Sequence, residues 1–368
     1  MRLRRIVLRR VEMPLRFRFR TSFGETTVKQ FLLVEADGGD SSGWGECVAD
    51  DAPLYSEETN ASAAHALGEF LVPAVLGRTF EGPEEFARLV APIRGNRMAK
   101  AALETALWDL AARENGVPLR DLLGGVRDRV PVGVSLGLQP SLDALRDLVA
   151  KHVEEGYRRI KLKIEPGRDV ALVSAVRERF PSIDLTVDAN AAYTRAETPA
   201  LRALDPFRLD YLEQPLGHED LWEHAALARE IATPICLDES IRSEADARVA
   251  ARIGAARVVN IKVGRVGGLA EARRIHDTCA AAGIPVWCGG MLESGVGRAA
   301  NIHLATLPNF AKPGDTSSAS RYFEEDIVDP PLEAQNGEMP VPPGPGIGVT
   351  VVRERLDRYT VAQEEFSA

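Results

Sequence analysis

The chain has 368 residues, of which 45% are hydrophobic, and it carries a net charge of −9 at pH 7. A chain of this length and composition can bury a large core and divide into two domains. The negative charge argues against nucleic acid and anionic membrane surfaces as partners, and no apolar run approaches the ~18 residues of a membrane span.

The first 125 residues combine strands with later helices. We expect strands at 6–13, 29–36 and 43–48, and helices at about 57–75, 83–93 and 97–115. Strands that precede a run of helices are typical of an α+β domain. The tail at 321–368 is rich in Pro and Gly at 340–349, and we expect it to return and pack on this domain.

Between residues 126 and 320, a strand-like segment recurs about every 25 residues. The segments are 159–164, 184–190, 210–215, 234–240, 258–264 and 284–290. Helical patterns lie between several of them, at 169–180, 220–231, 243–254 and 269–283. One strand, one helix and two short loops form the repeat of a parallel (β/α) barrel.

Five of these segments carry a charged residue at matching positions near their C-terminal ends. The residues are Lys163, Asp188, Glu213, Asp238 and Lys262, at spacings of 25, 25, 25 and 24. The C-terminal ends of barrel strands form the active-site face, so the five side chains should converge. Solvated charges on a surface loop would not repeat an apolar strand before each charge.

Three of the converging side chains could bind a metal ion. Asp188, Glu213 and Asp238 offer only oxygen ligands. Such ligands suit Mg²⁺, with Mn²⁺ or another divalent metal as alternatives, whereas Zn²⁺ would be expected to use His or Cys. The open alternative is that these carboxylates only pair with lysines at neighbouring strand ends.

Lys163 and Lys262 should face each other across that site. Lysine is a poor base at its solution pKa of about 10.4, and we expect burial, the metal and the nearby Lys161 to lower it. Two opposed bases around a metal suit abstraction of a proton next to a carboxylate, with the metal stabilising the enediolate.

The residues around the five charges form a specific set of motifs. These are Lys161-Leu162-Lys163, Asp188-Ala189-Asn190, Glu213-Gln214-Pro215, Asp238-Glu239-Ser240 and Lys262. With them, nearly the whole chain resembles the muconate-lactonising subgroup of the enolase superfamily. Within it, the chain is most similar to o-succinylbenzoate synthases that also racemise N-acylamino acids, notably N-succinylamino acids. The stretches that carry this closer similarity are 13–25, 43–48, 96–110, 156–167 and 287–301.

The resemblance implies a modified (β/α)7β TIM-type barrel at 126–320. An α+β capping domain at 1–125, joined by the tail at 321–368, would close over it. Loops at Phe19–Gly24 and Asp50–Tyr55 would shape substrate specificity and exclude water. An acid at Asp50 or Asp51 would disfavour a hydrophobic substrate side chain unless it points to solvent.

The resemblance also implies roles for individual residues. Lys163 and Lys262 would be the acid/base pair. The residues that would assist them or contact the substrate are Lys161, Asn190, Glu239, Arg265, Ser135, Phe19, Tyr55, Met291 and Leu292. Arg265 matches a position that the racemising branch tends to fill with Arg, and it could tune the pKa of Lys262. Alternatively, Arg265 could pair with a surface acid.

One enediolate would serve two reactions. These are the dehydration of 2-succinyl-6-hydroxy-2,4-cyclohexadiene-1-carboxylate to o-succinylbenzoate, a step of menaquinone biosynthesis, and the racemisation of N-succinylamino acids. The sequence leaves open dipeptide epimerisation, muconate cycloisomerisation and a non-catalytic metal-binding barrel. A dipeptide epimerase would be expected to show an Asp-x-Asp pair on the eighth strand, where this chain offers a single Asp315.

The remaining expectations concern cellular context. The four cysteines are scattered without paired spacing, which is typical of reduced thiols in a cytoplasmic protein. We expect a small-molecule carboxylate as substrate, no nucleic-acid or membrane partner, and a homo-oligomer.

Overall fold

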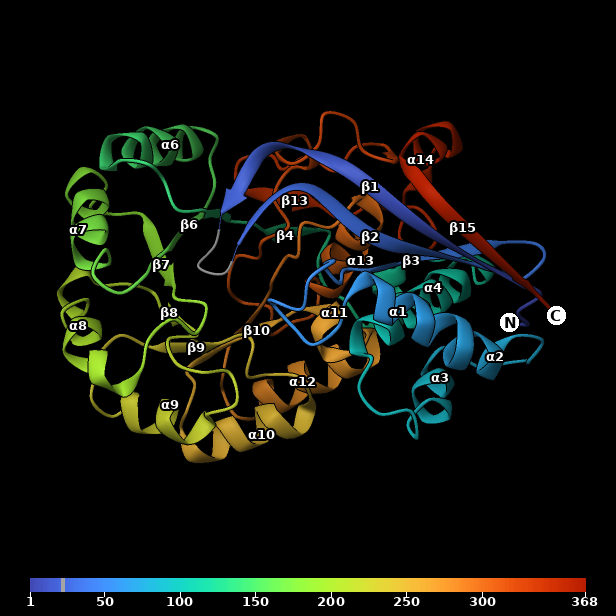
Figure 1. The fold of residues 1–368 in the computed structure, drawn as a ribbon, viewed down its shortest axis with the longest axis horizontal. Coiled ribbons are helices and arrows are strands. Elements are labelled where there is room, and N and C mark those ends of the chain that lie inside the picture. The colour runs from blue at the N-terminus through green and yellow to red at the C-terminus, as the bar shows by residue number, and fades with distance from the viewer. Residues whose placement is uncertain (21–23) are drawn as a thin grey trace.

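The computed structural model describes residues 1–20 and 24–368 and is built around two β-sheets (Figure 1). An antiparallel sheet of four strands has the order β15-β1-β2-β3, and a parallel sheet of seven strands has the order β11-β10-β9-β8-β7-β6-β5. Neighbours in the parallel sheet are also consecutive along the chain, as in a barrel. The fold is a modified (β/α)7β barrel with an α+β cap, which confirms the expected fold class.

The antiparallel sheet joins the start of the chain to its end. Its strands are β1 (Arg5–Arg20), β2 (Glu25–Asp37), β3 (Ser42–Cys47) and β15 (Thr360–Ser367). Strand β15 pairs with β1 along its length, so the tail forms an edge of the cap sheet. Strands β1 and β2 extend well beyond the expected 6–13 and 29–36, because alternating arginines and apolar residues continue the two-residue period to Arg20.

Helices cover one side of this sheet. They are α1 (Asn60–Ala66), the π-helical turn Leu67–Leu71, α2 (Val72–Val75), α3 (Glu84–Leu89), α4 (Arg97–Glu114) and α5 (Leu119–Leu123). Helix α4 lies directly against β3, where a Cβ atom at Gly43 or Gly45 would overlap the helix backbone. The two glycines therefore permit this close packing.

The parallel sheet is made of short strands. They are β5 (Val134–Leu136), β6 (Arg159–Lys163), β7 (Asp184–Asp188), β8 (Leu212–Glu213), β9 (Ile235–Leu237), β10 (Val258–Ile261) and β11 (Val286–Cys288). Several end earlier than expected because the backbone turns sharply after the charged residue. Asn190 and Gln214, for example, have positive φ angles of 42° and 37°.

An irregular segment closes the barrel. Phe310 forms a parallel bridge to Val286 of β11, and Gly314 forms one to Val132, just before β5. The backbone amide of Asp315 also donates to the carbonyl of Cys288. Residues 310–315 thus take the eighth position of the barrel wall.

The barrel strands are separated by helices. These are α6 (Leu142–Glu154), α7 (Val170–Arg179), α8 (Thr198–Arg202), α9 (Leu221–Leu227), α10 (Glu244–Ile253), α11 (Val263–Val266), α12 (Leu269–Ala281) and α13 (Gly295–Leu304). The side chains of Ser141, Ser243 and Ser294 accept backbone hydrogen bonds at the starts of α6, α10 and α13. These caps fix where the helices begin.

The remaining elements are short. They are β4 (Arg129–Pro131) paired with β13 (Glu338–Pro340), β12 (Val328–Asp329) paired with β14 (Thr350–Val351), α14 (Arg353–Tyr359), and 3-10 turns at Arg195–Glu197, Asp205–Phe207 and Ala319–Arg321.

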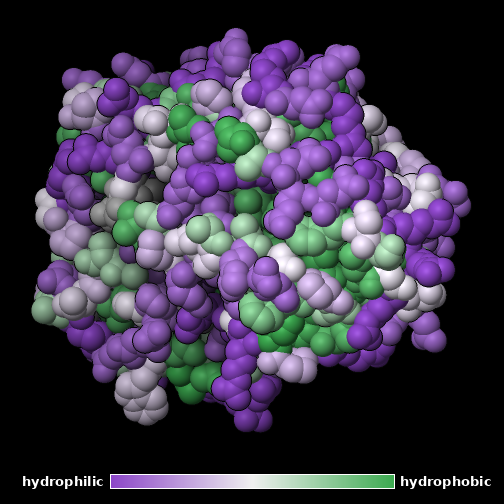
Figure 2. Space-filling view, turned by 45° about the vertical axis from the view of Figure 1, so that its right-hand side comes forward, coloured by the Kyte–Doolittle hydropathy of each residue, from purple (hydrophilic) through white to green (hydrophobic). Residues whose placement is uncertain are grey.

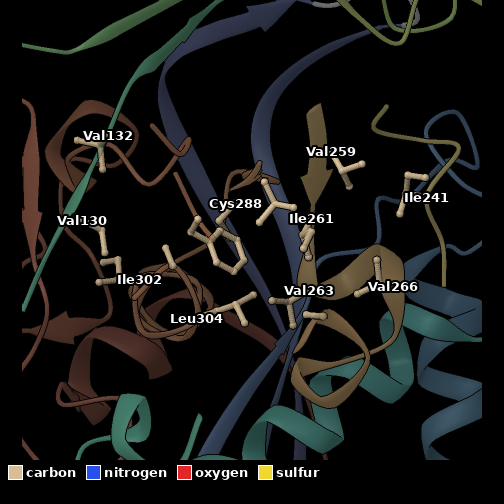
Figure 3. Close-up of a cluster of buried hydrophobic side chains, with 14 of the residues drawn as sticks. Val130, Val132, Ile241, Val259, Ile261, Val263, Val266, Cys288, Ile302 and Leu304 are labelled. Carbon is tan, nitrogen blue, oxygen red and sulfur yellow. The ribbon is translucent and has the colours of Figure 1, made fainter. Parts of the chain in front are cut away.

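A large hydrophobic core fills the space between the barrel strands and their helices. Figure 3 shows Ile261 and Val263 near Cys288 and Leu304 within this core. The face drawn in Figure 2 is mainly hydrophilic, with apolar groups toward its centre. Among the described residues, we find no helix with the length and apolar character needed to cross a membrane.

Buried carboxylates fasten the cap to the barrel and to the tail. Asp109 of α4 accepts backbone hydrogen bonds from Trp44 and from Ile347 in the tail, at 2.8 and 2.7 Å. Glu46 of β3 accepts from the backbone amide and hydroxyl of Ser294, at the start of α13.

The domain boundaries near residues 125 and 320 stay predictions.

Candidate functional site

The five charged residues lie together at one end of the parallel sheet. In the strand register, Lys163 is opposite Asp188, and Asp188 is opposite Glu213. Asp238 directly follows β9, and Lys262 directly follows β10. The carboxylate residues are at most 1% exposed and both lysines 8%. The barrel therefore brings the predicted set into one buried cluster.

Each carboxylate of the cluster contacts a cation of the protein. Asp188 Oδ2 lies 2.6 Å from Nζ of Lys163 and 3.5 Å from Nζ of Lys161. Asp238 Oδ2 lies 2.8 Å from Nζ of Lys262. The pairing of carboxylates with lysines, one of the two interpretations left open by the sequence, is thus what the side chains do here.

Glu213 is held from two sides. Its Oε2 accepts from Nζ of Lys161 at 3.0 Å, and its Oε1 accepts from the amide of Asn260 at 3.0 Å. Across residues 1–20 and 24–368, no three Asp, Glu, His or Cys side chains are arranged to hold one ion as they stand. In donor chemistry, however, three buried carboxylates at adjacent strand ends fit a hard divalent cation.

The carboxylates influence one another's ionisation. Burial alone would raise the pKa of Asp188, but Lys163, Lys161 and Lys262 outweigh it and lower that pKa below its usual range. Burial and the charge of Asp188 raise the pKa of Glu213. Crowded like charges that push pKa values apart are a mark of functional sites.

Among the protein's own groups, the pKa of Lys262 is raised rather than lowered, and the lowering expected from a bound metal stays a prediction. Burial does lower the pKa of Lys262, but the nearby Tyr55, Glu239 and Glu213 outweigh burial and raise it. The pKa of Lys161 is also raised, by Asp315, Glu213 and Asp188 against the effect of burial. At Lys161, carboxylates at hydrogen-bond distance have a larger effect on the pKa than the more distant cations.

Asn190 and Glu239 form a chain behind Lys163. Nζ of Lys163 donates to Oδ1 of Asn190 at 2.5 Å, and the amide nitrogen of Asn190 donates to Oε1 of Glu239 at 2.9 Å. The backbone amide of Asn190 also donates to Asp188. These contacts fix the direction of the lysine side chain.

Tyr55 and Arg265 surround Lys262. Nζ of Lys262 donates to the hydroxyl of Tyr55 at 3.0 Å and lies 4.5 Å from the centre of its ring. Arg265 is 4% exposed and pairs with Asp238 inside the barrel. The alternative in which Arg265 pairs with a surface acid is therefore wrong. Its guanidinium also lies 3.3 Å from the Tyr55 hydroxyl.

A cavity of about 400 Å³ opens above the cluster, between cap and barrel. This volume is in the range of small-molecule sites. Those residues of the predicted site that line it are Phe19, Tyr55, Ser135, Lys161, Lys163, Asp188, Asn190, Lys262, Met291 and Leu292. Glu213, Asp238, Glu239 and Arg265 are not among the lining residues.

The two cap loops expected to shape substrate specificity are described by the structure to different extents. Of the loop at Phe19–Gly24, Phe19 and Gly24 line the cavity, while residues 21–23 lie outside the described residues. In the loop at Asp50–Tyr55, Asp50 pairs with Lys29 at 2.8 Å and Asp51 with Arg10 at 3.2 Å. Their charges are compensated, which weakens the case against a hydrophobic substrate side chain.

Several polar groups at the cavity already bond to other groups of the protein. Some of these contacts were not predicted from the sequence. Met291 was expected to contact the substrate, but its backbone amide donates a hydrogen bond to Glu293. Asp315 accepts from Arg159 at 2.7 Å and pairs with Lys161 at 2.9 Å. Alternation along β6 could have identified Arg159, which lies two residues before Lys161 and hence on the same face. Asp315 gave no periodic signal, since it lies in the irregular closing segment.

Two further buried residues of the cavity wall lacked a sequence signal. Arg298 and Tyr322 line it, and the guanidinium of Arg298 lies 4.5 Å from the centre of the Tyr322 ring. Their positions follow from the path of α13 and the tail rather than from a strand repeat.

Comparison with known families gives two matches. Residues 4–124 match the family described as "Mandelate racemase / muconate lactonizing enzyme, N-terminal domain", and residues 144–355 match "Enolase C-terminal domain-like". Among characterised relatives, an N-succinylamino acid racemase of Thermus thermophilus is 54% identical over 368 residues, covering 100% of both chains. An o-succinylbenzoate synthase of Geobacillus kaustophilus is 53% identical over 356 residues, covering 96% of this chain and 95% of the relative.

Solved structures agree with these matches. An enolase superfamily protein from Listeria innocua superposes with a TM-score of 0.97 at 43% identity, covering 100% of this chain and 99% of the other. An N-succinyl Arg/Lys racemase from Bacillus cereus gives a TM-score of 0.93 at 27% identity, covering 100% of both chains.

Proposed function

The chain belongs to the enolase superfamily, in the group of mandelate racemase and muconate lactonizing enzyme, and from this premise we propose that Lys163 and Lys262 move protons at the carbon α to a substrate carboxylate. The protein is an enzyme, since its relatives with 44–54% identity are named as a synthase or a racemase. We propose that one site supports both N-succinylamino acid racemisation and o-succinylbenzoate synthesis.

The observation that carries this proposal is the placement of the two lysines. Lys163 ends β6 and Lys262 follows β10, so three strands lie between them in the sheet. Both nevertheless line one cavity with Asp188. A substrate carbon held in that cavity would present opposite faces to the two ammonium groups, which is the requirement for inversion by two bases.

Members of the superfamily generally use a divalent metal, and we propose Mg²⁺ held by Asp188, Glu213 and Asp238, with Mn²⁺ as a possible substitute. When bound, the ion would supply positive charge that stabilises the negative charge developing on the substrate carboxylate. It would also compete with the ammonium groups for the carboxylate oxygens, which favours neutral, basic lysine. Glu239 and Asn190 would keep Lys163 directed at the cavity.

In racemisation, one lysine removes the α-proton and the other delivers a proton to the opposite face. In the synthase reaction, Lys163 would take the proton and return one to the departing hydroxyl, while Lys262 stabilises charge. Tyr55 and Arg265 would orient Lys262 in both cases. The cap would exclude water from the carbanionic species.

The other reactions of the group have less support. Asp315, which stands where a dipeptide epimerase would hold the substrate amine, is already engaged by Arg159 and Lys161. We propose a small carboxylate as substrate, and a homo-oligomer in the cytoplasm stays a prediction.

The test follows α-proton exchange by proton NMR in D₂O with Mg²⁺, on L- and D-N-succinylphenylalanine separately. We expect exchange and inversion of both enantiomers, lost with EDTA and in Lys163→Ala or Lys262→Ala. Lys151→Ala, which removes a lysine with a 67% exposed side chain on α6, is the matched control and should keep full activity.

A second arm assays dehydration of the cyclohexadiene carboxylate with the same variants. Activity there without exchange of the amino acids would assign the site to the synthase alone. Inactivity in both arms, with the fold intact, would refute the proposal.

A further inference from the structure

A second cavity, of about 420 Å³, lies at the junction of cap and barrel, away from the strand-end cluster. From the cap it is lined by α3, the loop after α3 and the start of α4. From the barrel it is lined by Arg242 and Ser243 and by residues of α11 and α12. In Figure 1, α3, α4, α11 and α12 all lie below the cap sheet. We call this space the junction cavity.

The junction cavity is cationic. Its positively charged lining residues are Arg94, Arg97, Lys100, Arg242 and Arg274, and its acidic ones are Glu104 and Glu271. The whole chain shows the opposite balance, with 54 acidic and 45 basic residues. A local reversal of charge in a concave site favours anions.

Most of these cations lack a carboxylate partner. Arg274 pairs with Glu271. Across the described part of the chain, Arg94, Arg97 and Arg242 form no ion pair with a carboxylate. Arg97, Lys100 and Arg242 are only partly buried, so their unpaired charges line an open concave site and remain accessible to an external anion.

The positive charges of Lys100 and Arg97 lie close enough to repel each other. It is partly buried, and its ammonium group donates to the backbone carbonyl of Ile93. Burial lowers the pKa of Lys100, and the nearby Arg97 lowers it further. An anion between the two side chains would relieve this repulsion.

Glu104 does not neutralise the cavity. It is 1% exposed, and its Oε2 atom has no hydrogen-bond partner among the residues described. Burial raises the pKa of Glu104 to about 8. Near neutral pH the carboxyl is therefore mainly protonated, and it can donate a hydrogen bond.

We propose that the junction cavity binds a small anion with at least two negative charges, held by Arg97 and Lys100 from the cap and Arg242 from the barrel. Phosphate and dicarboxylates share this chemistry. Because the ligand would contact both parts of the protein, it would fasten the cap to the barrel. Arg242 lies four residues after Asp238, so the same ligand would also stabilise the loop that leaves the strand-end cluster.

The test measures thermal unfolding and calorimetric binding of the full chain with inorganic phosphate or with succinate. Sodium chloride keeps the ionic strength constant. We expect saturable binding and a rise of the melting temperature for at least one anion. The double variant Arg97→Gln/Lys100→Gln should bind roughly tenfold more weakly or worse, because it loses two charge-assisted contacts.

Three controls make the result specific. Arg229→Gln alters an exposed arginine elsewhere and should bind as the wild type does. Lys163→Ala/Lys262→Ala should also retain binding, which separates the junction cavity from the strand-end cluster. Arg97→Lys should restore part of the affinity, which distinguishes lost charge from misfolding. Absence of saturable binding, or binding unchanged in the double variant, would overturn the proposal.

Discussion

The hydroxyl of Tyr55, in the cap loop after β3, lies 3.0 Å from Nζ of Lys262 at the end of β10. The two residues are 207 positions apart in the chain. This contact means that the cap does more than cover the barrel, because it orients one of the two lysines proposed to move protons.

Replacing Tyr55 by Phe should reduce turnover without unfolding the protein. The change removes the hydroxyl that contacts Lys262 and Arg265 and keeps the ring. A hydrogen bond to a charged group contributes about 1.5–3 kcal/mol, so kcat should fall roughly tenfold or more. Steady-state kinetics measure kcat. The control is Tyr359→Phe, which alters a partly exposed tyrosine of α14. Unchanged kcat would show that Tyr55 does not orient Lys262.

Mg²⁺ should stabilise the protein through the three strand-end carboxylates. Binding to the folded state alone adds about 2.7 kcal/mol when the ligand is at a hundred times its Kd, which raises the melting temperature by several degrees. The Mg²⁺-induced shift should vanish in Asp238→Asn and persist in Asp184→Asn, which alters an exposed residue at the start of β7. A shift that survives in Asp238→Asn would place the ion elsewhere.

Asp109→Asn should destabilise the joint between cap and tail. The buried carboxylate accepts from Trp44, Ile347 and Arg113. An amide cannot accept from all of them, and it leaves Arg113 without its counter-charge. We expect a loss of about 3 kcal/mol in the free energy of unfolding, measured by urea denaturation. Asp121→Asn, whose side chain is 51% exposed, should change it by less than about 1 kcal/mol.

Glu46 should make stability fall as pH rises. Burial raises its pKa from 4.5 to about 7, and the charge of Glu293 adds to this effect. Between these pH values the unfolded chain has lost the proton that the folded protein keeps. The folded state therefore loses stability from pH 4.5 to 7, by on the order of 3 kcal/mol from this group.

Glu46→Gln should flatten this dependence, because the amide stays neutral throughout. The measurement is the free energy of unfolding by urea at pH 5 and pH 8, with the exposed Glu154→Gln as the control. Glu104, whose pKa is raised to about 8, should leave a residual slope in the variant. A slope equal to that of the wild type would exclude Glu46 as its source.

The sequence by itself determined the repeat and the identity of the strand-end residues. Hydrophobic runs and helix starts are local features that a sequence shows directly. A charged residue at the end of such a run lies at the end of a strand, and therefore on the face of the barrel formed by the strand ends. Lys163, Asp188, Glu213, Asp238 and Lys262 could be named for this reason. The predicted strands 210–215, 234–240 and 284–290 were too long, because the turns that end them depend on backbone conformations that a propensity pattern does not resolve.

Only the tertiary structure decided which groups meet. Asp315 lies in the irregular segment that closes the barrel, outside the 25-residue repeat. The repeat therefore could not predict its contact with Lys161. The cap loop brings Tyr55 to Lys262, and Arg265 turns inward to Asp238. The junction cavity likewise joins residues of α4 to Arg242, far away in the chain. Contacts of this kind depend on how separate elements pack, which local sequence patterns do not encode.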